Sequence, residues 1–195
     1  MKHITVYLFY GNRAADNFSH IIETSGSNDV LLADLELMNS IDNKYRDRIR
    51  FIQLNSIEAS ASVLDEYENI KNMVCMPMLS FEGGNLRENS RLLLRKCILC
   101  TNIIYLPVLR TPDIRLWYLT LPISEVFNAE EDMIISAFNA GVKTIAKVLA
   151  FEMEKRKVII NGIEYSNENA MEKLRYILEK TSSKPFYMNM QTIRL

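Results

Sequence analysis

Two adjacent stretches near the carboxyl end decide the fold, ISAFNAGVKTIAKVLAFEME at 135–154 and KVIINGI at 157–163. In the first, apolar and small residues recur at helical spacing for about five turns. The second is a short apolar run of the kind that forms a strand covered on both faces. A long helix that leads directly into such a strand is one step of an alternating α/β chain.

The same alternation extends outward through the rest of the sequence. Apolar runs of strand length occur at 4–9, 30–32, 49–54, 73–79, 114–119, 158–160 and 186–193. Helices are expected between them at 16–24, 38–46, 56–70, 87–106, 130–156 and 167–180, with Pro107 ending the fourth. The pattern predicts an α/β fold: one Rossmann-like domain over 1–195, with a three-layer, doubly wound parallel sheet of about seven strands.

The charge balance excludes several classes of partner. The chain has 195 residues, with 23 Lys and Arg against 24 Asp and Glu, so no net field favours nucleic acid or an anionic membrane. The residues at the amino end do not form a signal peptide. No uninterrupted apolar stretch approaches the roughly 18 residues that span a bilayer. We expect a soluble, cytoplasmic protein.

The cysteines predict neither disulfides nor a metal site. There are three, an odd number, and Cys97 and Cys100 form a C-x-x-C inside a continuous helical pattern. A structural zinc site needs four ligands, and only Cys75, His3 and His20 remain to complete one. We therefore expect buried structural thiols and no bound metal.

The two long helices expected at 87–106 and 130–156 carry apolar residues almost all round. A helix of this kind must be covered on both sides, and a sheet covers only one. A subunit interface is the simplest cover for the other side. Burial by the chain's own loops is the alternative.

The block from 134 to 163 resembles a known motif. It is similar to Y-S-A-S-K-A-G-V…L-A-x-E-L…V-N-x-I of the short-chain dehydrogenase/reductase family, as in the 3-oxoacyl-acyl-carrier-protein reductases. The order of strands and helices matches that family over essentially the whole chain. The resemblance implies a Rossmann-like fold and, in the family, NAD(P)-dependent oxidoreductase chemistry.

Laid on this chain, the family's catalytic motif is degenerate. In the family, a Tyr gives a proton to the carbonyl and a Lys four residues later lowers the pKa of the phenol. The resemblance places Ile135 at the Tyr position and Asn139 at the Lys position. The family's Ser falls near Pro122, and its helical Asn falls near Arg95. None of these four side chains can perform the family's reaction.

The turn that would hold the pyrophosphate is also altered. Where the family has T-G-x-x-x-G-x-G, residues 10–18 read YGNRAADNF, and Gly11 alone survives. Ala14 and Ala15 add side chains where a dinucleotide would approach the backbone. Arg13 could contact a phosphate, or it could be a solvated arginine in a turn.

The remaining cofactor positions are weak candidates. Asp34 lies near where the family reads the adenosine ribose, and Asn55 near where it contacts adenine. Each is equally a turn or cap residue. The family's N-N-A-G becomes MPML at 76–79, which adds bulk along the dinucleotide's path. We expect no cofactor, with NAD(P) as the alternative.

These observations favour a pseudoenzyme that acts as a homo-oligomer subunit or as the partner of an active reductase. One alternative is an active NAD(P)H-dependent reductase of a ketoacyl-type substrate that uses an unorthodox acid such as Tyr118 or Tyr10. The other is a binding module for a different small ligand.

Overall fold

The computed structural model describes residues 3–11, 18–78, 86–110, 113–121, 129–156, 158–164, 170–183 and 192–195. In chain order its strands are β1 (Ile4–Gly11), β2 (Asp29–Asp34), β3 (Arg50–Ile52), β4 (Ile70–Met78), β5 (Arg115–Leu119), β6 (Ile159–Glu164) and β7 (Thr192–Arg194). Its helices are α1 (Phe18–Thr24), η1 (Leu35–Ser40), α2 (Asn43–Arg46), α3 (Ile57–Leu64), α4 (Leu86–Arg110), α5 (Ala129–Glu152), η2 (Glu154–Arg156) and α6 (Ala170–Ser183).

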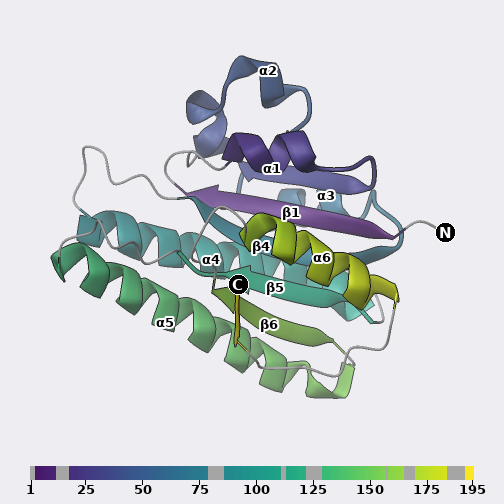
Figure 1. Ribbon diagram of the computed structural model, residues 1–195. Helices are drawn as coiled ribbons and strands as arrows, with labels where there is room; N and C mark the ends of the chain where they lie inside the picture. Colours follow the sequence, from purple (N-terminus) through teal and green to yellow (C-terminus); the bar gives the residue numbers. More distant parts are fainter. Residues whose placement is uncertain are drawn as a thin grey trace.

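The strands form one parallel sheet, as the sequence predicts. Their order is β3-β2-β1-β4-β5-β6-β7, so the chain reverses its direction of travel across the sheet between β1 and β4 (Figure 1). In a doubly wound sheet, this switch point is where ligands usually bind, beyond the carboxyl ends of the strands. The fold therefore directs attention to the ends of β1, β2 and β4.

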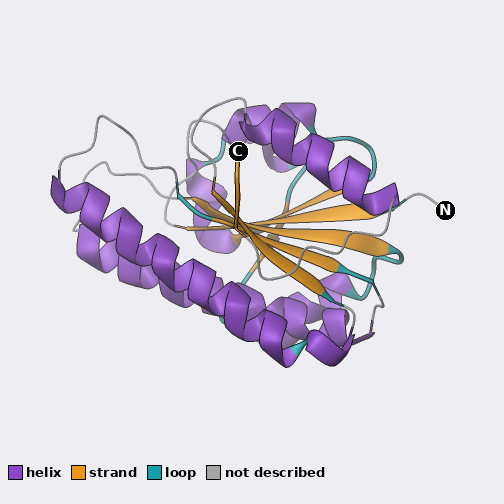
Figure 2. Ribbon diagram, turned by 60° about the horizontal axis from the view of Figure 1, so that its bottom comes forward, coloured by secondary structure: helices purple, strands orange, loops and turns teal. Residues whose placement is uncertain are grey.

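Helices cover both faces of the sheet (Figure 2). Because side chains alternate along β1, Val6, Leu8 and Tyr10 join the core beneath α3, α4 and α5, whereas Tyr7 and Phe9 join the core beneath α1 and α6. Both cores are closely filled, which confirms the predicted three-layer arrangement.

Several boundaries differ from the sequence-based expectation, and the helix expected over 38–46 is divided into η1 and the short α2. Two other differences have a clear physical reason. The helix expected over 56–70 ends at Leu64, and Ile70 already begins β4, because a turn that includes Asn69 at φ 63° separates them. Pro107 does not end α4, which continues to Arg110. Val108 is buried there, and Arg110 pairs with Asp65 at 3.1 Å. These contacts offset the backbone hydrogen bond that proline cannot donate.

The long helices α4 and α5 lie side by side on one face of the sheet (Figures 1 and 2). They touch closely where a side chain at Gly141 would come within 2.9 Å of a methyl group of Leu94. Both helices are long and apolar enough to cross a membrane by length and composition alone. Each also packs against the sheet, as core helices of the same composition do, so this property does not assign them to a membrane.

Candidate functional site

The described part of the switch point is built from the ends of β1, β2 and β4 together with α4. Gly11 ends β1 beside Met78, the last residue of β4. A Cβ atom at Gly11 would overlap the Met78 carbonyl oxygen, so only glycine allows the two strands to come this close. The surviving glycine of the predicted phosphate turn therefore has a packing role within the sheet.

Asp34, the predicted ribose-reading acid, lies at the carboxyl end of β2 and is only 3% exposed. It caps η1 by accepting a hydrogen bond from the backbone N–H of Glu36 at 3.4 Å. Its Oδ2 lies 2.6 Å from Nζ of Lys96, which α4 projects across this end of the sheet. The contact is a close ion pair without good hydrogen-bond angles.

Three acceptors surround the Lys96 ammonium. It donates hydrogen bonds to the Gly11 carbonyl oxygen and to Glu36 Oε2, each at 2.6 Å. Its third close contact is the ion pair with Asp34. We call Asp34, Glu36, Lys96 and the Gly11 carbonyl the Lys96 cluster.

Burial dominates the electrostatics of the Lys96 cluster. Loss of water raises the pKa of Asp34 above its ordinary value, while the close positive charge of Lys96 acts in the opposite direction. The Asp34 carboxylate thus depends on its internal cation. An acid at the end of β2 would ordinarily be free to accept ribose hydroxyls, and in this chain it is occupied.

Lys96 was missed in the sequence, although a signal for it exists. It falls on the inward stripe of α4, three residues after Leu93 and four before Cys100, both of which are buried. A lysine at such a position rarely stays buried without a partner. Its spacing could therefore have predicted an internal ion pair.

The two catalytic positions inferred from the resemblance lie on α5 and are buried. Ile135 is fully enclosed in the core beneath α4 and α5. Asn139 is 5% exposed and pairs its amide with the backbone of Leu121, just beyond β5. Its Oδ1 accepts from the Leu121 N–H at 2.8 Å, and its Nδ2 donates to the Leu121 carbonyl at 2.9 Å. This reciprocal pair fixes α5 to the end of β5.

Two further predicted positions, Arg95 and Asn55, do not join the Lys96 cluster. Arg95 is exposed on α4, and Asn55 is exposed in the turn between β3 and α3. Arg13 and Pro122 lie outside the described residues. The sequence-based assignments of Arg13 and Pro122 therefore stay predictions.

The alternative proton donors are enclosed in the core. Tyr10 and Tyr118 are fully buried, and burial raises the pKa of each hydroxyl well above its usual value. The Tyr118 hydroxyl lies 2.9 Å from Oγ1 of Thr101. A catalytic phenol needs a stabilised ionised form and contact with substrate, and these two side chains have the opposite environment.

The cysteines share this core. Cys75, Cys97 and Cys100 are all buried as free thiols, in agreement with the prediction of structural residues. Burial raises the pKa of Cys97 to about 12. Within the described ranges, no three His, Cys, Asp or Glu side chains are grouped to hold a metal ion.

No protein-family model and no curated protein sequence matches the chain. Solved structures do match it. An oxidoreductase from Escherichia coli K-12, whose description calls its function putative, has a TM-score of 0.69 at 10% identity and covers 100% of this chain and 95% of its own. A short-chain dehydrogenase from Leptospira borgpetersenii with bound NAD+ has a TM-score of 0.68 at 14% identity, covering 98% and 91%.

Acetoin dehydrogenase from Enterobacter cloacae has a TM-score of 0.65 at 12% identity and covers 100% of this chain and 94% of its own. At these identities the likeness concerns the fold. The seven-stranded sheet and its flanking helices are those of the short-chain dehydrogenases, as the resemblance implies.

Proposed function

We propose that this chain, whose fold is that of the short-chain dehydrogenases, is a non-catalytic subunit that acts through association, with a second copy or with an active reductase. The observation that carries the proposal is Lys96. Its buried ammonium pairs with the acid that the fold would otherwise offer to the ribose of a dinucleotide at the switch point.

A comparison of magnitudes favours the internal lysine over a ligand. A ribose hydroxyl that took the place of Lys96 beside Asp34 would separate this buried ion pair. Leaving a buried charge without its partner costs about 3–5 kcal/mol. A hydrogen bond from a hydroxyl to a carboxylate contributes about 1.5–3 kcal/mol. The exchange is unfavourable, so the residues of the Lys96 cluster do not fit a dinucleotide.

The α5 positions support the absence of catalysis. Isoleucine at 135 has no proton to give, and its side chain is part of the core. Asn139 has no charge with which to stabilise a phenolate, and both polar atoms of its amide are used by Leu121. The resemblance to 3-oxoacyl-acyl-carrier-protein reductases therefore concerns architecture, and we infer that the reductase reaction is absent.

The partner surface is the outer face of α4 and α5. On α5, exposed side chains follow at helical spacing and are apolar or small, with one threonine: Met133, Ala137, Ala140, Thr144, Val148 and Phe151. On α4, the exposed face includes Leu92, Ile98 and Tyr105. An apolar stripe with small residues suits a second helical face better than water. We name it the α4–α5 face, and we expect a cytoplasmic protein partner to cover it.

Two measurements test the proposal. With NADPH and a 3-oxoacyl thioester, oxidation of the nucleotide should proceed no faster than without protein. Native mass spectrometry of the pure protein, alone and mixed with an active short-chain reductase, should give a dimer or larger assembly, homomeric or mixed. Turnover by the pure protein, or a strict monomer in both samples, would contradict it.

A further inference from the structure

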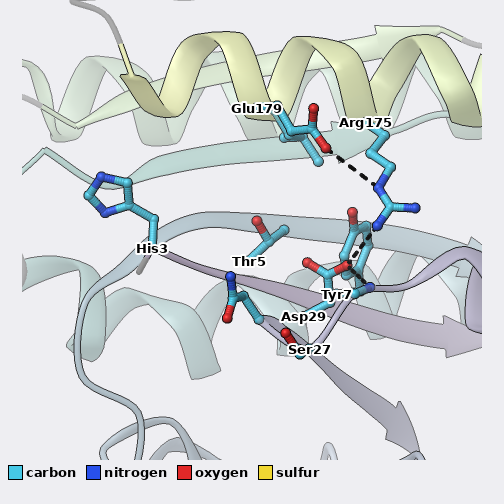
Figure 3. Close-up of a pocket in the computed structure, with 10 residues that line it drawn as sticks. His3, Thr5, Tyr7, Ser27, Asp29, Arg175 and Glu179 are labelled. Carbon is cyan, nitrogen blue, oxygen red and sulfur yellow. Dashed lines mark hydrogen bonds and ion pairs between the residues drawn. The ribbon is translucent and has the colours of Figure 1, made fainter. Parts of the chain in front are cut away.

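A cavity lies at the opposite end of the strands from the Lys96 cluster. It has a volume of about 380 Å³ at the amino ends of β1 and β2, beneath α6 (Figure 3). Its walls come from β1, from the turn over 26–29 and from α6. The size falls in the range of small-molecule sites. The described residues that line this cavity lie at the amino ends of the strands and on α6, away from the carboxyl ends where the fold usually binds a dinucleotide.

The floor of the cavity departs from the pattern of a central strand. β1 pairs on both sides and should be apolar on both faces. Its later residues obey this rule, and Phe9 packs edge-on against Phe18 with ring centres 4.7 Å apart. On the same face, however, His3 and Thr5 are polar and line the cavity together with Tyr7. The amino half of β1 therefore offers hydrogen-bonding groups where apolar packing is expected.

The Tyr7 hydroxyl is the least explained of these groups. Only 5% of the Tyr7 side chain is exposed, and burial raises the pKa of its hydroxyl, with Asp29, Arg175 and Glu179 as the charged groups that act on it. Within the described parts of the chain, no atom forms a hydrogen bond with that hydroxyl. The hydroxyl oxygen is not among the fully enclosed unpaired polar atoms, so it is open to water or to a ligand in the cavity. Its place in the wall of a cavity suggests a partner that comes from outside the chain.

The charges around the cavity leave an excess of negative charge. Among the described residues that line it, Asp29 and Glu179 face one cation, Arg175 (Figure 3). The guanidinium of Arg175 makes its close hydrogen bond to the Thr24 carbonyl oxygen. Its nitrogens lie farther from the carboxylates, at 3.9 Å from Asp29 and 3.7 Å from Glu179. These distances exceed the roughly 2.7–2.9 Å of a strong charge-assisted hydrogen bond.

One carboxylate oxygen of Asp29 accepts a hydrogen bond that fixes the side chain, and the other accepts none from the described residues. Its Oδ2 accepts a hydrogen bond from the Gly26 N–H at 2.7 Å, which closes the turn before β2. The other oxygen points away from Arg175 toward the side of the cavity where Thr5 lies (Figure 3). Burial is the largest influence on this carboxyl and raises its pKa in spite of Arg175, so the internal cation does not fully compensate it.

We propose that this cavity binds a small organic ammonium ion, with Asp29 as the main anionic contact and Tyr7 as a hydrogen-bonding partner. An ammonium group would donate to the free oxygen of Asp29 and reach the Tyr7 hydroxyl, while Glu179 adds attraction at the rim. One ammonium group of the ligand neutralises the excess of two carboxylates over one guanidinium among the described lining residues.

Calorimetric titration of the intact protein with putrescine tests the proposal, with inorganic phosphate as the anionic probe. Putrescine should bind saturably and phosphate should not. Asp29→Asn keeps an acceptor for the Gly26 N–H but removes the charge, and it should weaken putrescine binding about tenfold or more. Tyr7→Phe removes only the hydroxyl and should weaken it several-fold, about the effect of one neutral hydrogen bond.

The matched control is Glu58→Gln, which removes the same charge from an exposed position on α3. It should leave putrescine binding within about twofold. Absence of saturable putrescine binding, preferential binding of phosphate, or equal weakening by Asp29→Asn and Glu58→Gln would overturn the proposal. If Asp29→Asn fails to fold, Tyr7→Phe decides alone, because it loses no hydrogen bond of the fold; unchanged binding in that variant would then refute the site.

Discussion

Nζ of Lys96 lies 2.6 Å from Oδ2 of Asp34, and only 5% and 4% of these two side chains are exposed to solvent. The pair joins the inward face of α4 to the carboxyl end of β2, across the place where the fold usually admits a ligand. The protein thus carries its own cation at that place. A buried pair is held in position by both partners, and its removal has consequences for stability as well as for binding.

Lys96→Met should destabilise the protein. Methionine preserves the length of the side chain but leaves Asp34 buried without a counter-charge, so we expect a loss of about 3–5 kcal/mol in the free energy of unfolding, measured by urea denaturation. Lys44→Met removes a lysine from an exposed pair with Asp42 at 3.9 Å and should cost less than about 1 kcal/mol. Equal losses in the two variants would show that the buried pair has no special role.

Gly11→Ala should be far more damaging than Gly141→Ala. At position 11 the added methyl group meets the backbone carbonyl of Met78, which cannot move without displacing a strand. We therefore expect the free energy of unfolding to fall by about 1–3 kcal/mol or more. At position 141 it meets a terminal methyl of Leu94, which can rotate, and alanine favours a helix by about 1 kcal/mol. Thermal melts of both variants compare the two effects directly, and similar melting temperatures would contradict the close approach of β1 and β4.

Restoration of the family's motif should not restore a reductase. The double change Ile135→Tyr with Asn139→Lys inserts bulk into the core and breaks both hydrogen bonds to Leu121. Each buried backbone group left unpaired costs about 1–3 kcal/mol. We expect a less stable protein without NADPH oxidation, whereas Lys147→Ala on the exposed side of α5 should be nearly neutral. Measurable turnover by the double variant would show that the site had lost only these two groups.

Phe151→Glu should reduce the oligomeric state. Phe151 is 72% exposed on the α4–α5 face, and a carboxylate there would be buried without a partner in any assembly that uses this face. Light scattering after gel filtration should give a smaller particle. Tyr176→Glu is the matched control, since Tyr176 is 62% exposed on α6, on the other side of the sheet. If only Tyr176→Glu reduced the particle size, the interface would lie on α6 and not on the α4–α5 face.

Asp29→Asn should stabilise the folded chain near neutral pH. Burial raises the folded-state pKa of this carboxyl above 3.8, so the charged form is disfavoured by folding. That penalty is absent well below pH 3.8 and is complete above the folded-state pKa. The advantage of asparagine should therefore grow as pH rises through this window and level off, as urea denaturation at several pH values can measure. An advantage confined to acid pH would reverse the sign of the argument.

The fold could be predicted because the hydrophobic pattern of each segment matches the burial that a parallel sheet with helices on both faces requires. Apolar runs such as 73–79 are long enough for buried strands, and the parallel sheet follows from their alternation with helices. The boundaries were less predictable, since the end of α3 depends on a left-handed Asn69 and the extension of α4 beyond Pro107 depends on tertiary contacts.

The sites were harder to predict than the fold. Asp34 was identified as a candidate, but its occupation by Lys96 depends on a contact between residues that are far apart in sequence. The cavity at the amino ends of β1 and β2 combines Tyr7, Asp29 and Arg175. These residues are far apart in sequence, so no spacing along the chain predicts that they meet. Only the inward stripe of α4 and the polar start of β1 gave local signals.

If Lys96 closes the dinucleotide position, the wild-type protein should not bind NADH or NADPH in a calorimetric titration. We predict no saturable binding up to about 1 mM of either dinucleotide. The same titration of Lys96→Met, at a temperature where that variant remains folded, separates the effect of the lysine from that of the rest of the site. Saturable micromolar binding of NADH or NADPH by the wild-type protein would show that Lys96 does not close this position.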